Sequence, residues 1–318
     1  MFVGNRILVT GAAGFIGVNL LKRLLQTDAV AIRGTLHVRD AVLTDPRIEY
    51  VRGDLTTPDA CAAACADMDY VFICSAVTSG AAVMANTPLC HLTPNLVMNA
   101  RLLEAAYAAR VKKTLFVSSN TVYPVSDKAM AEGDCTNEFY EKYHIVAWMK
   151  RFSEIMCEMF ARRVRQPMAT IVVRPANAYG PYDKFDWETS HVLPALIRRV
   201  VERHNPMVIW GDGKDIKDFI YVEDLVDGMV RAMDTIEGYD EVNLASGEGY
   251  CLRDILALLL KLEGFESAQV TYDASKPTMI PKRLIDPAKA RQLLGFSATT
   301  SIEDGLRRTL AWYKSTRP

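Results

Sequence analysis

Three glycines near the start of the chain have the spacing of a phosphate-binding loop. Gly11, Gly14 and Gly17 stand in "VTGAAGFIG", between an apolar run and a helical pattern. Without side chains there, the backbone can approach a pyrophosphate, whose charge is favoured by the N-terminus of the helix. Phe15 and Ile16, at the start of that helix, are predicted to share the contact. This context predicts a dinucleotide site, and an ordinary tight turn is the alternative.

The end of the second apolar run bears on which dinucleotide binds. NAD sites usually carry Asp or Glu at that point, where the acid binds the ribose hydroxyls. Here the run ends in "GTLHVRD", so His37 and Arg39 take that place. A cation suits the 2′-phosphate of NADP, which favours NADP over NAD, although a solvated arginine is the alternative. Asp54, followed by Leu55 in "GDL", is predicted either to bind the adenine amino group or to cap the next helix.

Short apolar runs alternate with helical patterns over the first 175 residues. The runs begin near residues 6, 29, 48, 70, 114 and 169, and clear helical patterns cover residues 18–27, 95–110 and 146–163. Near-continuous apolar strands that alternate with helices predict an α/β fold with a doubly wound parallel Rossmann sheet. In such sheets, ligand-binding residues gather beyond the carboxyl ends of the strands.

The pattern changes after residue 175, where Pro, Gly, Trp and charged residues become frequent. We predict an NAD(P)-binding Rossmann domain over residues 1–175 and a smaller mixed α/β substrate lobe over residues 176–318. The lobe should contain a helix at residues 192–203 and short strands in "PMVIWGDG", "YDEVNLASG" and "AQVTYD". We expect it to be interleaved with the main sheet, without a sharp boundary.

Composition limits the classes of partner. The chain has 318 residues, 50% of them hydrophobic, and a net charge of -1, which gives no reason to expect nucleic acid or a membrane surface. No signal peptide is predicted, and no apolar run approaches the roughly 20 residues that span a bilayer. The seven cysteines form no C-x-x-C pair, so no metal site is predicted. A reducing, cytoplasmic setting fits these features.

Seven motifs in order along the chain resemble the extended short-chain dehydrogenase/reductase family, in the group that acts on nucleotide sugars. They are "TGAAGFIG", "GDL", "NLVMNARLLEAA", "FVSSNTVYP", "KRFSE", "VVRPANAYGP" and "YVEDLVDGM". The resemblance implies an NAD(P) domain followed by a nucleotide-sugar lobe. It also implies further cofactor contacts at Ser75, Ala76, Asn95, Pro175 and Asn177.

Within that family, "SHVLPALIRR", "VIWGDG" and "KPTMIPKRLID" are most similar to the GDP-fucose synthase branch, which epimerises and reduces a GDP-4-keto-6-deoxy sugar. The likeness implies that His191 is the acid of the epimerisation. It implies substrate contacts at Asn177, His191, Arg199, Trp210, Lys217 and Arg283. These types suit the ligand, since a diphosphate needs cations and a base or sugar face needs a flat aromatic. From the residues alone, His191 as a plain buried histidine and Arg199 as a solvated helix position remain alternatives.

The usual proton donor of the family is missing from its place. Family members pair a tyrosine with a lysine four residues later, which lowers the tyrosine's pKa and holds the cofactor ribose, while a serine or threonine orients the substrate oxygen. Ser119 and Lys150 fill the serine and lysine places, but Val146 fills the place of the tyrosine.

Neighbouring residues offer substitutes for that tyrosine. Tyr143 precedes Lys150 by seven residues, which on a regular helix is about 10.5 Å, too far for direct contact. Tyr143, Tyr140 and His144 are candidates to reach the substrate from the start of the helix. The alternative is that these rings only pack the loop.

A second departure lies two residues after the serine. The GDP-fucose synthase branch carries a cysteine there as the partner of its histidine, and this chain has Thr121. A threonine hydroxyl has too high a pKa to act as an unaided base, so His191 is expected to lack its partner. The Asp–Glu pair of 4,6-dehydratases is also absent, because Asn120 and Thr121 stand in its place.

Three functions therefore stay open. The first is an NAD(P)-dependent epimerase or reductase of a nucleotide sugar, GDP-linked by likeness. The second is a non-catalytic subunit that binds cofactor and nucleotide sugar, which Val146 and Thr121 would favour. The third is dehydration by Lys150 with a carboxylate from "YDKFDWETSH"; Asp183, Asp186 and Glu188 are the candidates, unless these acids are merely solvated.

The resemblance also implies a homodimer held by a four-helix bundle, with residues 95–110 and 146–163 of each copy as the helices. The stretch "WMKRFSEIMCEMF" has apolar residues on most sides, as expected of a helix buried against both a sheet and a partner. Burial in the core of one chain is the alternative.

Overall fold

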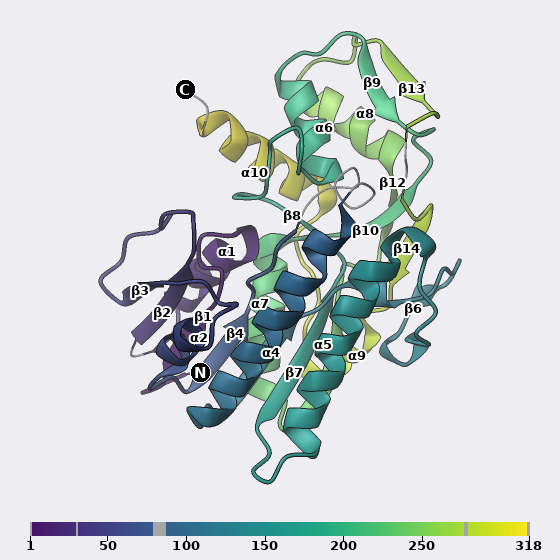
Figure 1. Ribbon diagram of the computed structural model, residues 1–318. Coiled ribbons are helices and arrows are strands. Elements are labelled where there is room, and N and C mark those ends of the chain that lie inside the picture. Colours follow the sequence, from purple (N-terminus) through teal and green to yellow (C-terminus); the bar gives the residue numbers. More distant parts are fainter. Residues whose placement is uncertain (1, 30, 79–86, 277–278, 317–318) are drawn as a thin grey trace.

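A seven-stranded parallel sheet forms the larger part of the computed structural model, which describes residues 2–29, 31–78, 87–276 and 279–316 (Figure 1). The strand order is β11-β7-β5-β4-β1-β2-β3. Their bounds are Arg6–Val9 for β1, Ala31–Leu36 for β2, Ile48–Arg52 for β3, Tyr70–Ile73 for β4, Lys113–Val117 for β5, Ala169–Pro175 for β7 and Tyr239–Leu244 for β11. The order reverses between β1 and β4, which confirms the predicted doubly wound α/β fold and places the switch point there.

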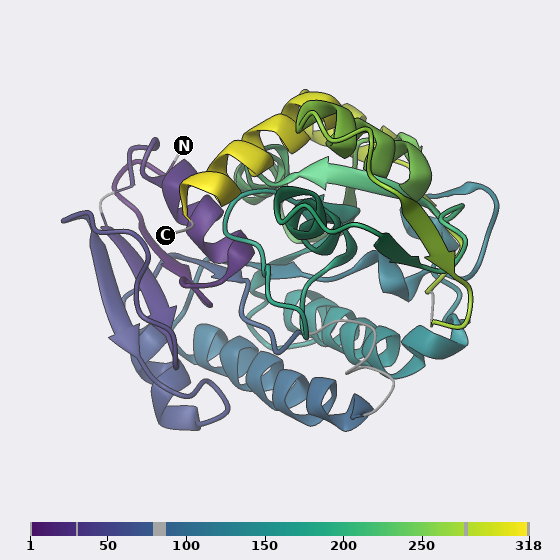
Figure 2. The same ribbon diagram turned by 90° about the horizontal axis from the view of Figure 1, so that it is seen from above.

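Alternate residues of each strand face two separate cores. Leu115 of β5 faces a core shared with α1 (Phe15–Leu24), α7 (Val222–Thr235) and α9 (Ala288–Leu294). Its neighbour Phe116 faces a second core, shared with α2 (Pro58–Cys65), α4 (Thr93–Ala108) and α5 (His144–Arg162). Figure 2 shows α4 and α5 together on one side of the sheet. Burial on both faces explains why these strands are continuously apolar.

Segments beyond residue 175 return to this sheet. Strand β11 pairs in parallel with β7 along its whole length, from Tyr239 opposite Thr170 to Leu244 opposite Pro175. Helix α7 packs over β5 and β7 and against α1. The second part of the chain therefore supplies both an edge strand and a covering helix to the large sheet.

The remaining elements form a smaller lobe with its own core, which includes Leu193, Ile197, Leu256 and Leu310. Its helices are α6 (Val192–Val201), α8 (Leu252–Leu262) and α10 (Ile302–Ser315). Its strands are β8 (Asn177–Tyr179), β9 (Met207–Trp210), β10 (Ile216–Tyr221), β12 (Gly249–Cys251), β13 (Val270–Asp273) and β14 (Lys282–Ile285), and β14 also pairs with β6 (Ala129–Met130). Within the described ranges, no helix combines the length and apolar character needed to cross a membrane.

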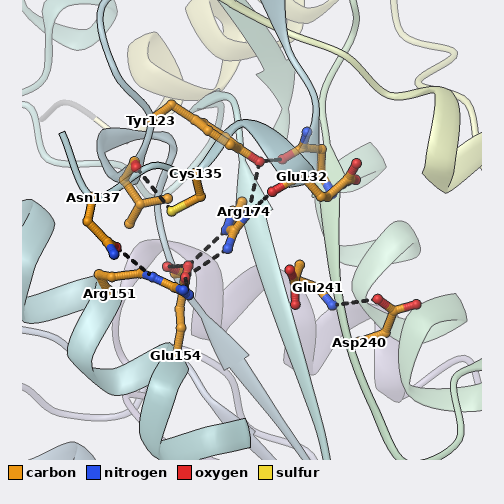
Figure 3. A network of polar contacts seen from close by, with 12 residues as sticks. Tyr123, Glu132, Cys135, Asn137, Arg151, Glu154, Arg174, Asp240 and Glu241 are labelled. Carbon is orange, nitrogen blue, oxygen red and sulfur yellow. Dashed lines mark hydrogen bonds and ion pairs between the residues drawn. The ribbon is translucent and has the colours of Figure 1, made fainter. Parts of the chain in front are cut away.

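A buried polar network joins three elements of the large domain (Figure 3). Glu154 of α5 and Arg174 of β7 are both fully buried and form two hydrogen bonds, of 2.9 and 2.8 Å. Ser118, at the end of β5, donates to the same carboxylate at 2.5 Å. Arg174 also donates to the Tyr123 hydroxyl at 3.2 Å, and that hydroxyl donates to Asn243 at 2.6 Å. The network therefore fixes α5, β5 and β7 relative to one another.

Removal of the buried carboxylate should destabilise the fold strongly. We expect Glu154→Ala to lower the free energy of unfolding by about 3–5 kcal/mol, because the Arg174 charge would stay buried without its partner. The matched control is Glu158→Ala, which breaks the exposed pair with Arg162 on the same helix and should change stability by about 0.5 kcal/mol or less. Urea denaturation measures both, and equal losses would show that the network does not anchor these elements.

Candidate functional site

The glycine loop leaves a concave surface made of backbone. Gly11 adopts a φ of +68°, and a Cβ atom there would lie 2.9 Å from the Cα of Ser75. A Cβ atom on Gly17 would overlap the carbonyl oxygen of Gly11. Gly14 is the N-cap of α1. The N–H groups of Phe15 and the residues after it lack partners within the helix and point out of its end. No acidic residue in the first turn competes for them. This arrangement fits the pyrophosphate of a dinucleotide.

Two threonines hold the neighbouring loops against the glycine loop. The Gly11 N–H donates to the Thr35 hydroxyl of β2 at 3.0 Å. The Thr10 hydroxyl accepts the N–H groups of Cys74 and Ser75, both at 3.1 Å, after β4. The ends of β1, β2 and β4 are thereby linked, with Ser75 half-buried and Ala76 exposed at the same edge. Sequence analysis did not identify either threonine, because their contacts join segments far apart in the chain.

Basic residues lie together at the end of β2, the position that distinguishes NAD from NADP in Rossmann folds. His37 and Arg39 are exposed beyond that strand. Arg52 of β3 donates to the His37 carbonyl and forms an ion pair with Asp40 at 2.6 Å. The predicted pair of cations therefore has a third beside it.

Asp54 and Leu55 shape the turn that leads into α2. One Asp54 carboxylate oxygen accepts the N–H of Thr56 at 2.9 Å and its hydroxyl at 2.8 Å, and these bonds lower the pKa of Asp54. The Leu55 side chain is buried, and its carbonyl accepts the Cys61 thiol at 3.1 Å. Asp54 is not the predicted cap of the next helix, because the N-cap residue of α2 is Thr57; its carboxylate instead closes the turn before that helix.

Asn95 supports the segment after β4 with its entire amide group. Its Oδ1 accepts the Val77 N–H at 2.8 Å, and its Nδ2 donates to the carbonyls of Val77 at 3.0 Å and His91 at 2.7 Å. The residue is buried. Its amide is occupied within the chain, so we infer an indirect effect on the cofactor through the position of Val77.

Ser119 and Thr121 lie together after β5. The Ser119 hydroxyl accepts the Thr121 N–H at 3.2 Å and caps the short turn Asn120–Val122. The Asn120 amide donates to the Pro175 carbonyl at 3.0 Å, which places this turn beside the end of β7. The Thr121 hydroxyl oxygen is buried and has no hydrogen-bond partner among the described residues. A buried hydroxyl of this kind is one that a ligand would satisfy.

Lys150 reaches the end of β5 from α5. Its Nζ donates to the Val117 carbonyl at 2.8 Å and lies 4.9 Å from the centre of the Phe116 ring. Burial lowers its pKa to about 8, although the charge of Glu154 opposes this shift. Val146 lies one turn earlier on the same helix and offers no proton.

The candidate substitutes for the tyrosine have different neighbours at the start of α5. Tyr143 ends the short helix Glu141–Tyr143, and its ring packs edge-on against Tyr140 at 5.8 Å. Burial raises the pKa of Tyr143 to about 12, and the charge of Arg283 of β14 opposes this rise. His144 is exposed and packs against Phe139 and Trp148, each at 6.4 Å. Tyr143 therefore faces the smaller lobe, and His144 belongs to another surface.

His191 is the N-cap residue of α6 and is held by a buried carboxylate. Its Nδ1 lies 3.1 Å from Oδ1 of Asp183, whose side chain is fully buried, whereas the His191 side chain is 46% exposed. Burial disfavours the charged imidazole, but the hydrogen bond and charge of Asp183 outweigh burial and raise the pKa of His191. The other ring nitrogen, Nε2, has no partner among the residues that the structure describes.

Two buried cations stand side by side on β10 and β14. Lys217 is opposite Arg283 in the parallel register, and it pairs with Asp215 at 3.3 Å. Arg283 donates to the backbone carbonyls of Tyr123 at 3.0 Å and Pro124 at 2.7 Å. Its Nε is buried without a hydrogen-bond partner in the described ranges, and burial lowers its pKa to about 10. An anion would complete this group.

Asn177 connects the lobe to the large sheet. Its Nδ2 donates to the Asp218 carbonyl at 2.8 Å, and its strand β8 pairs with β10. It follows Pro175 of β7 by two residues, so it stands where the chain passes from one sheet to the other.

Arg199 and Trp210 line a hollow of about 280 Å³ on the lobe. The complete lining is Trp187, Arg199, His204, Pro206, Val208 and Trp210. The guanidinium groups of Arg198 and Arg199 lie 4.1 and 4.8 Å from the Trp187 ring centre. Sequence analysis missed Trp187 and His204; the only signal was an aromatic within a charged loop that precedes the two arginines.

Comparison with known proteins supports a common origin over most of the chain. Residues 7–245 match the NAD dependent epimerase/dehydratase family. The chain is 29% identical to probable GDP-L-fucose synthase 1 of Oryza sativa subsp. japonica, over 98% of this chain and 92% of the relative. It is 33% identical to GDP-L-fucose synthase 1 of Arabidopsis thaliana, over 77% and 76%.

A solved structure agrees with these relatives in fold. It is a point mutant of UDP-glucuronic acid 4-epimerase from Bacillus cereus, in complex with UDP-4-deoxy-4-fluoro-glucuronic acid and NAD. The TM-score is 0.85 at 26% identity, with 98% of this chain and 100% of that chain covered. These matches confirm the predicted resemblance and its assignment to a family of NAD(P)-dependent nucleotide-sugar enzymes. The chain belongs to the NAD dependent epimerase/dehydratase family.

Proposed function

We propose that the protein uses NADP(H) to reduce, and in part to epimerise, a GDP-linked keto sugar without the usual tyrosine. The observation that carries the proposal is His191, whose Nδ1 is held by the buried Asp183 and whose Nε2 is left for a substrate proton. An imidazole oriented in this way is suited to acid–base work near neutral pH. A pure binding protein needs no such arrangement.

The cofactor would be held by the glycine loop and by cations on either side of it. The N–H groups at the start of α1 suit the pyrophosphate. Arg39 and Arg52 suit a 2′-phosphate, which supports NADP over NAD. Lys150 of α5, whose Nζ lies at the end of β5, would contact the nicotinamide ribose. When bound, the cofactor would supply or accept the hydride.

The nucleotide sugar would lie across the smaller lobe. The hollow between Trp187 and Trp210 offers flat walls for a base, with Arg199 as a cation beside it. Lys217 and Arg283 suit the diphosphate, because both are buried cations and Arg283 has an unsatisfied Nε. The names of the relatives from rice and Arabidopsis favour GDP as the nucleotide.

Reduction is better supported than epimerisation. Reduction of a carbonyl needs one proton donor at the oxygen, and epimerisation needs proton transfer on two faces of the neighbouring carbon. His191 provides one acid–base group, but Thr121 cannot act as an unaided base on the other face. We therefore assign hydrogen bonds to the substrate oxygen to Ser119 and Thr121, and proton transfer to His191.

Lys150 is a second candidate for the proton donor at the carbonyl oxygen, as the alternative to His191. Its pKa of about 8 lies near working pH, where a general acid is most effective. Tyr143, with its pKa raised to about 12 by burial, stays protonated at that pH and can serve as a hydrogen-bond donor. Dehydration by Lys150 has less support among its three candidate carboxylates. That of Asp186 is occupied by Thr189 and that of Asp183 by His191, and Glu188 is exposed.

A homodimer and a cytoplasmic setting stay predictions. Helix α5 exposes Trp148, Phe152 and Met159 by 41%, 49% and 49%, which supports a partner against α4 and α5. A contiguous apolar helix face of this kind is typical of an oligomer interface. Sedimentation equilibrium tests the dimer, and a monomer at micromolar concentration would contradict it.

Replacement of His191 should remove turnover and leave cofactor binding intact. We expect His191→Asn to lower kcat/KM for NADPH oxidation with a GDP-4-keto-6-deoxyhexose by about 100-fold or more, the usual contribution of a general acid–base. The control His144→Asn, at the exposed start of α5, should have a kcat/KM close to that of the unchanged protein. UDP- and dTDP-linked keto sugars should react more slowly. Firm NADPH binding with no turnover of any sugar would contradict the proposal and favour a non-catalytic subunit.

The lowered pKa of Lys150 predicts a pH-dependent contribution to stability. The folded pKa is about 8 and the ordinary value is 10.5. Between these values the unfolded state binds more protons, so the Lys150 contribution to stability rises with pH. Relative to Lys150→Met, the protein should gain roughly 1–3 kcal/mol of unfolding free energy from pH 7 to pH 10. A difference that urea denaturation finds constant over this range would show that Lys150 has an ordinary pKa.

A further inference from the structure

Residues 181–186 form a strap between the smaller lobe and the cofactor loop. At one end, the buried Asn19 of α1 donates to the Pro181 carbonyl at 3.0 Å. At the other end, Arg198 of α6 donates to the Phe185 carbonyl at 2.8 Å. The strap is therefore held both to α1, whose N-terminus is the proposed pyrophosphate site, and to α6, whose N-cap residue is His191.

Lys184 projects from this strap across the carboxyl ends of the strands. Its Nζ donates to the Thr78 carbonyl at 2.5 Å and to the Thr78 hydroxyl at 3.0 Å. Thr78 follows β4, Arg39 follows β2, and β1 lies between those two strands in the sheet. Burial and then the charge of Arg39 lower the pKa of Lys184. Lys184 therefore contacts the segment after one of the two strands that flank β1, and Arg39 follows the other; the end of β1 leads into the glycine loop.

Neither Lys184 nor Arg39 has a carboxylate in ion-pair contact, among the residues described. Asp183 and Asp186 offset part of the Lys184 charge from nearby. However, Asp183 is hydrogen-bonded to His191, and Asp186 accepts the hydroxyl and N–H of Thr189 at 2.6 and 2.7 Å. Two cations that converge on a glycine loop without a dedicated acid are suited to a phosphate.

We propose that Lys184 is a further cofactor-binding residue. On cofactor binding, Lys184 would release Thr78 and, together with Arg39, bind a phosphate group of the dinucleotide. The inference rests on the proposed dinucleotide site, and it adds a cation from the lobe to a site otherwise built on the large sheet. Because Asp183 precedes Lys184, the same contact would also hold the residue that orients His191. The phosphate is either the pyrophosphate or the 2′-phosphate of NADP.

Equilibrium titration of the full-length protein with NADPH and with NADH tests this assignment. We expect Lys184→Gln to weaken NADPH binding by about tenfold or more, as for loss of a charge-assisted hydrogen bond. Lys184→Arg should recover most of the affinity because it keeps the charge. The control Lys261→Gln removes one exposed lysine from α8 and should leave both dissociation constants unchanged. If Lys184→Gln weakens the binding of NADPH and NADH equally, the phosphate that Lys184 contacts is the pyrophosphate. If it weakens only NADPH binding, that phosphate is the 2′-phosphate.

Thermal unfolding without cofactor separates binding from a structural role. If Lys184 only holds the strap to Thr78, Lys184→Gln will lower the Tm but will bind NADPH and NADH as tightly as Lys261→Gln does. That result would overturn the assignment and leave the proposed function standing. If the unchanged protein binds neither dinucleotide, the proposed function and this assignment both fail.

Discussion

The buried ion pair between Glu154 and Arg174 is the contact on which the geometry of the site depends. It joins α5 to β7 (Figure 3), and Ser118 donates to the same carboxylate from the end of β5. Glu154 follows Lys150 by one helical turn, and Ser118 precedes Ser119. Movement of one element would leave a buried charge without its partner, which is costly. The lysine and the serine are therefore held in one arrangement before any ligand binds, as catalysis requires.

Beyond the carboxyl ends of these strands, the candidate binding groups are backbone N–H groups on the large sheet and cations on the lobe. On the side of the large sheet, the glycine loop presents peptide groups, and no acid enters the first turn of α1. On the side of the lobe, Lys217 and Arg283 stand opposite each other on β10 and β14, and Arg199 lines the hollow with Trp210. A dinucleotide and a nucleotide sugar are both polyanions, and these cations suit them. The strap at residues 181–186 links the two sides.

Hydrophobic periodicity predicts individual strands and helices, whereas contacts between distant segments decide how they pair and which side chains meet in the site. Strands buried on both faces, such as residues 169–175, are continuously apolar and were predictable. Strand β11 is not continuously apolar, since it contains Asp240, Glu241 and Asn243, so only its pairing with β7 assigns it to the large sheet. In the site, the glycine spacing and Lys150 follow from short motifs. Thr10 escaped prediction because it acts through Ser75, far away in the sequence, and Trp187 because it stands within a charged loop. The choice between Tyr143 and His144 also required the structure, because it depends on the direction in which α5 begins.

The most direct measurement of the central claim is a crystal structure of the full-length protein with NADPH and a GDP-sugar. The account predicts the pyrophosphate at the N–H groups that begin α1, and the reacting sugar carbon or its oxygen within about 3 Å of Ser119 and His191 Nε2. Both ligands should share the crevice between the large sheet and the lobe. A crevice that excludes the dinucleotide, or a sugar held away from both side chains, would contradict the account.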